Sequence, residues 1–377
     1  MEPKIRFKGF EGGWKTSTIG EIAPLQRGYD LPTNNVISGT IPVVYSNGIL
    51  RFHNEGKCQA PAIITGRSGT IGKFTYIDHG EYWPHNTSLW VTTFHKNYPR
   101  FVYYFFQNVG FEKYATGSGV PTLNRNDIHK HIESIPSNKE EQQAIASYFT
   151  TLDSQISAST SRLASLKQMK AASLQAMFPQ EGETVPKIRF KGFKGEWKKV
   201  KADSIFKTFN EKNRPDLPVL SATQDRGMVT RESIGYNIFH DTSNEATYKH
   251  ILPGQFVIHL RSFQGGFAHS EIEGIASPAY TIIDFKNKDL YHDYYWRYVF
   301  MSKEFIKRLE LITYGIRDGR SISYDEFKEM SFLVPSKEEQ IKIASYLKNL
   351  DRQISLQSQR LEKLKQIKSA CLDKMFV

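Results

Sequence analysis

A glycine-rich run gives this sequence its closest approach to a catalytic motif. The run reads GRSGTIGK, from Gly66 to Lys73. A phosphate-binding loop needs four residues before its Gly-Lys pair and a Ser or Thr after it. Here five residues intervene and Phe74 follows. The run therefore predicts a turn between two strands. A turn beside a phosphate backbone is the second interpretation, because the run carries Arg67, Ser68 and Lys73.

Other signatures of catalysis are missing from the sequence. The histidines form neither HExxH nor another metal-ligand spacing, and Cys58 and Cys371 have no CxxC neighbour. The sequence has neither the Asp/Asn-Pro-Pro-aromatic tetrapeptide nor the FxGxG motif of base methyltransferases. It also has no convincing PD…ExK nuclease pattern and no GxSxG motif of a nucleophilic serine. We therefore expect no catalytic residues, no metal site and no cofactor on this chain. The cysteine usage fits a reducing cytoplasm.

Two loop-rich stretches carry side chains suited to reading DNA. Arg, Asn and Gln pair with guanine or adenine edges, and Ser and Thr suit phosphates. In residues 18–135 the candidate DNA-binding residues are Arg27, Tyr29, Asn47, Arg51, Arg67, Ser68, Lys73, Asn86, Ser118, Thr122, Asn124 and Arg125. In residues 202–334 they are Gln224, Arg226, Arg231, Arg261, Ser262, Gln264, Arg317, Arg320 and Ser323. Ordinary turn chemistry explains any single one better, but the set favours DNA.

The composition agrees with a polyanionic partner. The 377 residues include 50 Lys and Arg against 39 Asp and Glu, a net charge of +11. This length allows two or three domains, each with its own core. No run of about 18 apolar residues predicts a membrane span. The polar N-terminal segment lacks the apolar centre of a signal peptide.

The two stretches share one order of predicted elements. Strands around turns are expected at 39–50, 60–77 and 87–94, a buried helix at 101–114 and a loop at 115–128. The second stretch repeats this order with strands at 217–229, 254–270 and 277–285, a helix at 291–309 and a loop at 313–327. Their sequences show no clear identity. One scaffold therefore carries two different sets of loops.

An internal repeat surrounds these stretches. The segment KEEQQAIASYFTTLDSQISASTSRLASLKQMKAASLQAMF, residues 139–178, returns at 337–376 with about half of its residues identical. A shorter lead, PKIRFKGFEGGWK at 3–15, returns at 186–199. Two copies are too few for a solenoid, so the pattern indicates a duplication. The joint at 179–186, PQEGETVP, is polar and rich in breakers, as expected of a linker.

Each long repeat predicts a helix with a heptad seam. Apolar residues recur at alternating steps of four and three, and about 40 residues at about 1.5 Å each give a rod of about 60 Å. The seam residues are Ile145, Phe149, Leu152, Ile156, Leu163 and Leu166, and Ile343, Leu347, Leu350, Ile354, Leu361 and Leu364. Polar residues occupy matching places, at Ser159 and Gln357 and at Lys170 and Lys368. Ser137 and Ser336 are the expected N-caps.

Such a seam needs a partner helix. The expected partner is the duplicate, antiparallel if the molecule has an internal two-fold axis. The alternative is two separate amphipathic helices, each packed on its own domain.

The repeats resemble the specificity subunit of type I restriction–modification systems. The resemblance covers the whole chain and rests on the KGFxGxW leads and the helix motif. Its strongest residues are Glu141, Gln142, Ile145, Leu152, Asp153, Ile156, Leu163 and Lys167, with their copies Glu339, Gln340, Ile343, Leu350, Asp351, Ile354, Leu361 and Lys365. The loop ATGSGVPTLNRNDI resembles the loop that closes a target-recognition domain. The second loop lacks its Pro-x-Leu-Asn element, so its domain is expected to belong to another subtype.

The resemblance implies an α+β fold. It consists of two mixed α/β target-recognition domains, at 1–135 and 186–334, and two long helices at 136–178 and 335–377, with a linker at 179–185. The helices would form an antiparallel coiled coil in a pseudo-two-fold internal repeat.

The resemblance also implies a non-catalytic DNA-binding protein of the cytoplasm. Each domain would read half of a split double-stranded target, and the helices would fix the gap. Two modification subunits carrying S-adenosylmethionine would dock on them, and ATP- and Mg-dependent restriction subunits would join. The competing hypotheses are a coiled-coil DNA-binding adaptor or regulator unrelated to restriction, and a methyltransferase or nuclease. An adaptor would form a symmetric dimer on identical half-sites, which the divergent stretches disfavour.

Overall fold

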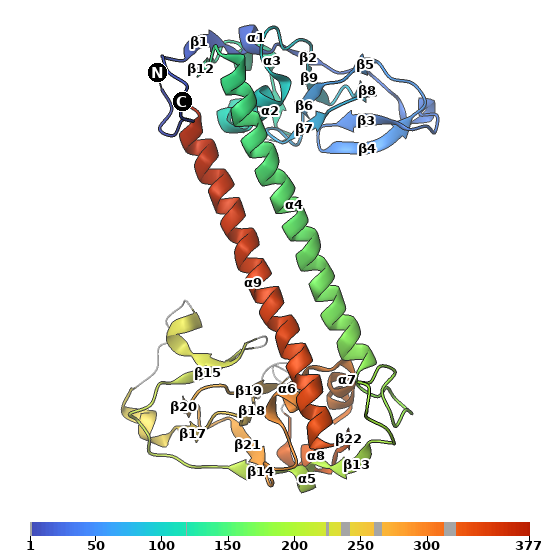
Figure 1. Ribbon diagram of the computed structural model, residues 1–377, viewed down its shortest axis with the longest axis vertical. Helices are drawn as coiled ribbons and strands as arrows, with labels where there is room; N and C mark the ends of the chain where they lie inside the picture. Colours follow the sequence, from blue (N-terminus) through green and yellow to red (C-terminus); the bar gives the residue numbers. More distant parts are fainter. Residues whose placement is uncertain (1, 118, 224–225, 235–241, 260–265, 313–321) are drawn as a thin grey trace. The chain divides into compact units, whose positions relative to one another are not determined.

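The computed structural model describes the chain apart from residues 1, 118, 224–225, 235–241, 260–265 and 313–321 (Figure 1). For 242–244 and 310–312 only the backbone is described. The described chain forms two compact units. Unit 1 comprises Met1–Ser161 with Gln359–Val377, and unit 2 comprises Arg162–Ser358. The helices α4 (Lys139–Ala176) and α9 (Lys337–Met375) each contribute one part to each unit.

Unit 1 is built from short antiparallel strands and a few helices. Its strands are β1 (Lys15–Thr18), β2 (Leu25–Arg27), β3 (Ile41–Tyr45), β4 (Gly48–His53), β5 (Cys58–Gln59), β6 (Ala62–Gly66), β7 (Phe74–Ile77), β8 (Glu81–Pro84), β9 (Ser88–Val91), β10 (Ala115–Thr116), β11 (Thr122–Leu123) and β12 (Ile132–Ile135). Besides its part of α4 and α9 it holds α1 (Ile19–Ile22), α2 (Pro99–Val109) and α3 (Arg125–His129), with 3-10 turns at Thr33–Asn35 and Phe111–Tyr114. Two four-stranded sheets have the orders β2-β9-β6-β7 and β4-β3-β8-β5.

Unit 2 repeats this construction with different residues. Its strands are β13 (Lys198–Lys201), β14 (Phe206–Phe209), β15 (Leu220–Thr223), β16 (Gly227–Thr230), β17 (Lys249–Ile251), β18 (Phe256–Ile258), β19 (Phe267–His269), β20 (Gly274–Ala276), β21 (Thr281–Phe285) and β22 (Ser331–Val334). Its shorter helices are α5 (Ala202–Ile205), α6 (Asp293–Met301), α7 (Lys303–Ile312) and α8 (Tyr324–Glu329), with 3-10 turns at Arg231–Ile234 and Thr242–Thr247.

The sheet order shows the duplication that the sequence predicts. The sheet β14-β21-β18-β19 of unit 2 has the same order as β2-β9-β6-β7 of unit 1. Each unit is closed by a pair of strands, β1 with β12 and β13 with β22, in matching antiparallel registers. The mixed α/β plan predicted for both stretches is confirmed. The glycine-rich run forms the turn between β6 and β7, as its first interpretation predicts.

Two predicted helices are shorter than expected. The helix expected at 291–309 is wrong as a single element, because the backbone of Ser302 is extended, with φ −70° and ψ 144°. The Ser302 Oγ accepts a hydrogen bond from the backbone N–H of Phe305 at 3.2 Å and so caps the first turn of α7. In unit 1, α2 ends at Val109, because Gly110 adopts the left-handed φ of 73° that terminates many helices.

The N-cap prediction is right for one long helix and wrong for the other. Ser336 Oγ accepts from Glu339 N at 3.4 Å, as expected. In α4 the cap is Asn138 rather than Ser137, since Asn138 Oδ1 accepts from Glu140 N at 2.7 Å. The serine is one residue too early to reach the first free N–H groups of α4.

The two long helices pack against each other within each unit. In unit 1, Tyr148 Oη lies 3.4 Å from Cys371 Sγ, and the rings of Phe149 and Phe376 stack at 5.9 Å. In unit 2, Ser173 Oγ lies 3.3 Å from Tyr346 Oη.

Every seam residue predicted from the heptads is buried or half-buried. In unit 1, residue numbers fall along α9 as they rise along α4, so the pair is antiparallel, as expected. In unit 2 the pairs Ser173–Tyr346 and Lys170–Asp351 give the same direction. The alternative of two unpaired helices is wrong.

The seam lysines are matched by carboxylates on the opposite helix. Lys368 Nζ lies 2.7 Å from Asp153 Oδ1, and Tyr104 Oη of α2 donates to Asp153 Oδ2 at 2.9 Å. In unit 2, Asp351 accepts from Lys170 at 2.6 Å and from the hydroxyl of Tyr298 in α6 at 2.7 Å. Each tyrosine–aspartate–lysine set therefore joins the α/β part of a unit to both long helices.

We expect Tyr104→Phe to lower the free energy of unfolding by about 1–2 kcal/mol, the usual contribution of a half-buried hydrogen bond to a carboxylate. Tyr298→Phe should have a similar effect on unit 2. Urea denaturation followed by circular dichroism measures both changes. Tyr29→Phe is the control and should change the midpoint little, because its hydroxyl bonds the weakly polar Cys58 thiol rather than a carboxylate. An unchanged midpoint in both test variants would mean that these hydroxyls do not hold the helices.

The two lead segments, at 3–15 and 186–199, are bound to the long helices. The Arg6 guanidinium donates to both carboxylate oxygens of buried Glu141, at 2.7 and 2.9 Å, and Arg189 binds Glu339 in the same way at 2.7 and 2.7 Å. The backbone N–H of Ile5 donates to Lys374 O at 2.9 Å, which brings the two chain ends together (Figure 1). Glu141 and Glu339, which occupy the same place in the two copies of the helix motif, therefore have a structural role.

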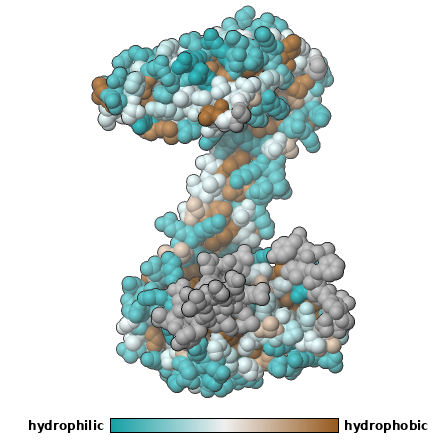
Figure 2. Space-filling model, turned by 180° about the vertical axis from the view of Figure 1, so that it is seen from behind, coloured by the Kyte–Doolittle hydropathy of each residue, from teal (hydrophilic) through white to brown (hydrophobic). Residues whose placement is uncertain are grey.

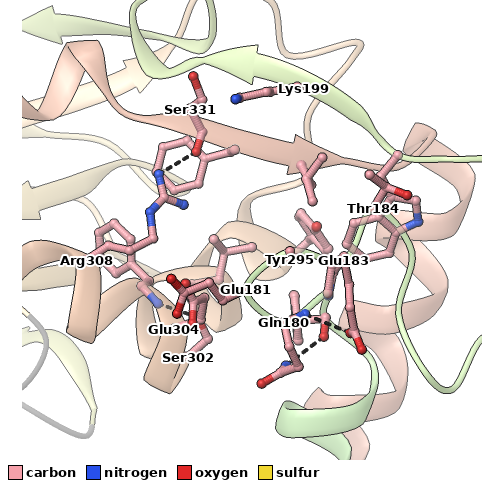
Figure 3. Close-up of a pocket in the computed structure, with 18 residues that line it drawn as sticks. Gln180, Glu181, Glu183, Thr184, Lys199, Tyr295, Ser302, Glu304, Arg308 and Ser331 are labelled. Carbon is pink, nitrogen blue, oxygen red and sulfur yellow. Dashed lines mark hydrogen bonds between the residues drawn. The ribbon is translucent and has the colours of Figure 1, made fainter.

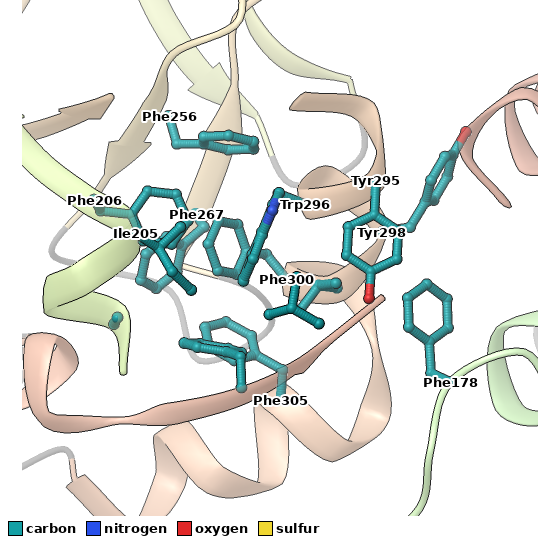
Figure 4. Close-up of a cluster of buried hydrophobic side chains, with 14 of the residues drawn as sticks. Phe178, Ile205, Phe206, Phe256, Phe267, Tyr295, Trp296, Tyr298, Phe300 and Phe305 are labelled. Atoms are coloured by element: carbon teal, nitrogen blue, oxygen red, sulfur yellow. The ribbon is translucent and has the colours of Figure 1, made fainter. Parts of the chain in front are cut away.

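Aromatic side chains fill the cores of both units. In unit 2 the indole of Trp296 meets the ring of Phe206 edge-on, with ring centroids 5.0 Å apart (Figure 4). The ring of Phe332 also meets the indole edge-on, at 5.1 Å. In unit 1, Phe101 stacks on Phe105 at 6.0 Å. Edge-to-face and stacked rings pack well and add to the burial term. This packing accounts for much of the high aromatic content of the chain.

Candidate nucleic-acid interface

Loops from distant parts of the sequence converge at one edge of unit 1. The backbone N–H of Arg67 donates to Thr87 O at 2.8 Å, and Leu123 N donates to Arg67 O at 2.7 Å. The Tyr29 N–H donates to Pro84 O at 2.8 Å. The loops after β2, β6, β8 and β10 are therefore hydrogen-bonded into one surface.

Glycines allow these loops to approach so closely. A Cβ on Gly28 would lie 2.2 Å from the carbonyl oxygen of His85, and one on Gly66 would lie 1.8 Å from that of Thr70. Both distances are impossible for a side chain, so only glycine fits there. Gly66, the first glycine of the run that resembles a phosphate-binding loop, thus allows the turn to fold back on itself.

Several predicted DNA-binding residues lie on this surface. Ser68 forms a β-bridge with Thr122, and the Asn86 amide donates to the carboxylate of Asp30 beside Tyr29. Asn47 is exposed at the turn between β3 and β4, whose neighbour Ser46 packs near Gly69. Sequence reasoning missed Asp30, because nothing in its local sequence marks it as the partner of an amide 56 residues away.

The remaining predicted residues of unit 1 have other surroundings. Arg27 is exposed at the end of β2, 3.7 Å from Asp30, and Arg51 is exposed on β4. Lys73 is exposed where the turn enters β7. Asn124 is a helix cap, since its Oδ1 accepts from Asn126 N at 3.0 Å, and Arg125 begins α3.

A pair of tilted aromatic rings lies beside these loops. The rings of Tyr45 and His85 lie 4.1 Å apart, and His85 Nδ1 is 3.0 Å from Thr87 Oγ1. Burial lowers the pKa of His85, so the imidazole is neutral at pH 7. The half-buried Tyr45–His85 pair therefore adds a neutral, partly apolar contact beside the polar loops.

Unit 2 presents basic residues at the corresponding hairpin. Arg226 is exposed between β15 and β16, and its Nη1 donates to Ser233 O at 3.5 Å. Arg231 opens the next 3-10 turn, with its guanidinium 5.9 Å from the ring of Tyr248. The two arginines predicted here thus lie on neighbouring segments. Ser323, also predicted, precedes α8, where its carbonyl accepts from Phe327 N at 3.0 Å.

Other predicted residues lie outside the described part of the chain. They are Ser118, Gln224, Arg261, Ser262, Gln264, Arg317 and Arg320.

A pocket of about 530 Å³ lies in unit 2 beneath the linker (Figure 3). Its lining combines aromatic residues such as Trp197 and Tyr295 with charged ones. Glu181 is paired with Lys307 at 2.9 Å, and Arg308 donates to Ser331 O at 2.6 Å. The Glu181–Lys307 pair joins the linker to α7, and the Arg308 hydrogen bond joins α7 to β22.

Within the described residues, no three His, Cys, Asp or Glu side chains form a group that could hold a metal ion. A search of the same part of the chain finds no helix that is long and apolar enough to cross a membrane.

Comparisons with known proteins agree with this architecture. The family model described as "Type I restriction modification DNA specificity domain" matches twice, over residues 11–168 and 194–366. The fold is similar to the S subunit of a type I restriction–modification system from M. genitalium, with a TM-score of 0.68 and 15% identity over 100% of this chain and 99% of that one. A chain from work on complex assembly and conformational transition of the type I R-M system gives a TM-score of 0.52 at 15% identity, covering 97% and 98%. The sequence has no significant match among curated proteins.

Proposed function

Because the chain belongs to the family of type I restriction–modification DNA specificity proteins, we propose that it reads a two-part target in double-stranded DNA, one part with each unit. The observation that carries this proposal is a repeated frame with different loops. Both units use the same sheet order and the same Arg–Glu and Tyr–Asp–Lys anchors. The turn of the β3–β4 hairpin in unit 1 carries Asn47, and the turn of the corresponding β15–β16 hairpin in unit 2 carries Arg226. Two surfaces with different side chains on one scaffold suit two different half-sites.

The proposed readers in unit 1 are Tyr29, Asn47, Arg67, Ser68, Asn86 and Thr122, and those in unit 2 include Arg226 and Arg231. Asn pairs with adenine and Arg with guanine in the major groove, and Ser and Thr suit phosphates. Arg27, Arg51, Lys73 and Arg125 are exposed cations that suit the backbone.

The proposal extends to an assembly. The paired helices α4 and α9 would set the gap between the half-sites and would offer their exposed faces to two modification subunits. Those subunits would hold S-adenosylmethionine, and restriction subunits would use ATP and Mg. The specificity chain itself would need no cofactor and would catalyse nothing. Since chromosomal DNA is the proposed ligand, the place of action would be the cytoplasm.

We expect the full chain to bind duplex DNA with a steep dependence on salt, because each phosphate contact releases a counterion. Lys73→Ala should reduce the slope of log K against log salt by about 1, as should Arg125→Ala. Fluorescence anisotropy between about 50 and 200 mM salt measures the slope.

Lys96→Ala is the control for the salt experiment. Lys96 is exposed too, but it follows the Val91 end of β9, whereas the converging loops lie at the Ser88 end. A slope near zero for the unaltered chain would contradict DNA binding through phosphates.

A further inference from the structure

The edge strand β4 of unit 1 contains a bulge. In its pairing with β3, Val44 lies opposite Ile49 and Val43 lies opposite Arg51, so Leu50 is the extra residue. A bulge breaks the alternation of side chains and turns one outward. Leu50 is accordingly 57% exposed.

The bulge leaves an apolar run uncovered. Ile49 is 44% and Phe52 is 53% exposed, and Arg51 between them is exposed too. Edge strands are normally protected by charge, proline or a covering element, because an apolar edge invites association. Figure 2 shows brown surface at the end of unit 1 that carries these strands. Three large apolar side chains in four residues of an edge strand indicate a surface that is covered when the protein works.

The run is continuous with the proposed DNA surface. The turn before β4 consists of Ser46 and Asn47, and Ser46 Oγ lies 3.7 Å from the position of a Cβ on Gly69, in the loop of Arg67 and Ser68. Arg51 adds a positive charge to the run itself. Neighbouring cations and polar readers fit a nucleic acid better than a second apolar protein surface.

We propose that the edge strand β4 and the turn before it face the major groove and that Leu50, with Ile49 and Phe52 beside it, contacts thymine methyl groups. This inference rests on the proposed function and adds a class of base to it. The major groove admits β-strands, and β4 with the turn before it forms an outer edge of its four-stranded sheet. The C5 methyl of thymine is the one apolar group that base edges present in this groove. The bulge places Leu50 outward for this contact, and Asn47 at the adjoining turn can pair with the adenine of a neighbouring pair.

The test uses the full chain and a duplex that it selects from a random-sequence pool. Each thymine of the half-site is replaced in turn by deoxyuridine, which lacks only the methyl group. At one or more positions the replacement should weaken binding about fourfold, the effect of losing one buried methyl. In Leu50→Ala the same replacement should have no effect, because its partner is gone. Anisotropy titrations of the unaltered chain and of Leu50→Ala, each with the thymine duplex and the deoxyuridine duplex, measure the coupling between Leu50 and the methyl group.

Ile132→Ala is the matched control. Ile132 is 60% exposed in the same unit, on β12, and its variant should keep the fourfold sensitivity to deoxyuridine. If Leu50→Ala keeps that sensitivity at every position, the inference is wrong and the proposed function stands. If the variant binds DNA normally but loses a purified modification subunit, the run is a protein-docking surface and the inference is also overturned. If the unaltered chain binds no duplex, the proposed function itself fails.

Discussion

Exchange of residues 18–135 for the corresponding segment of another specificity protein will change one half of the DNA target and leave the other half unaltered. The loops that converge in unit 1 all lie within this segment, whereas unit 2 keeps its own loops. The expected change is complete for the affected half, because each mismatched base pair costs about 1–3 kcal/mol and several would change together.

The graft must preserve the contacts that hold the segment to the long helices. Tyr104 donates to Asp153, and the Gln142 side chain bonds to Asn97 and to the backbone of Tyr98. A graft that keeps Tyr104 and Asn97 therefore separates altered recognition from a failure to fold.

Sequencing of methylated bases in a host that supplies the modification subunits will measure the target. The reciprocal graft of residues 202–334 is the control and should change the other half alone. Alteration of both halves by a single graft would contradict the assignment of one half-site to each unit.

Trp296→Ala will lower the free energy of unfolding by about 3–5 kcal/mol, the usual cost of removing a large buried aromatic side chain. The indole is fully buried in α6 and contacts Phe206 and Phe300 (Figure 4). It also contacts Phe332. Its loss leaves a cavity between α6, β14 and β22 that these rings can fill only in part.

Urea denaturation followed by circular dichroism will show this loss as an earlier midpoint. Leu290→Ala is the control in the same unit, because Leu290 is 55% exposed and its truncation should change the midpoint little. Equal midpoints for Trp296→Ala and the unaltered chain would mean that this aromatic cluster does not determine the stability of unit 2.

Much of the fold follows from the sequence alone because its signals are local or repeated. The heptad spacing identifies the seam residues from Ile145 to Leu364, and each of them is buried or half-buried in the structure. The turn signals at Ser46-Asn47 and Gly66–Lys73 lie between strands, as expected. Periodicity and turn chemistry act over a few residues, so one sequence is sufficient to detect them.

The exact residues at which helices begin and end are harder to predict. A serine at 137 and an asparagine at 138 are both good caps, and only the backbone path decides between them. The break at Ser302 has no proline or glycine to announce it. Its cause is a side-chain hydrogen bond that competes with the helix.

The long-range pairs were decided by the tertiary structure. Lys368 occupies a seam position because Asp153 faces it from the other helix, and Glu141 is buried because Arg6 binds it. The sequence by itself determined the duplication, the two rods and their seams, since these depend on spacing along the chain. Which loops meet, and which side chains share a surface, depends on hydrogen bonds between residues far apart in sequence. Only folding brings those residues within bonding distance.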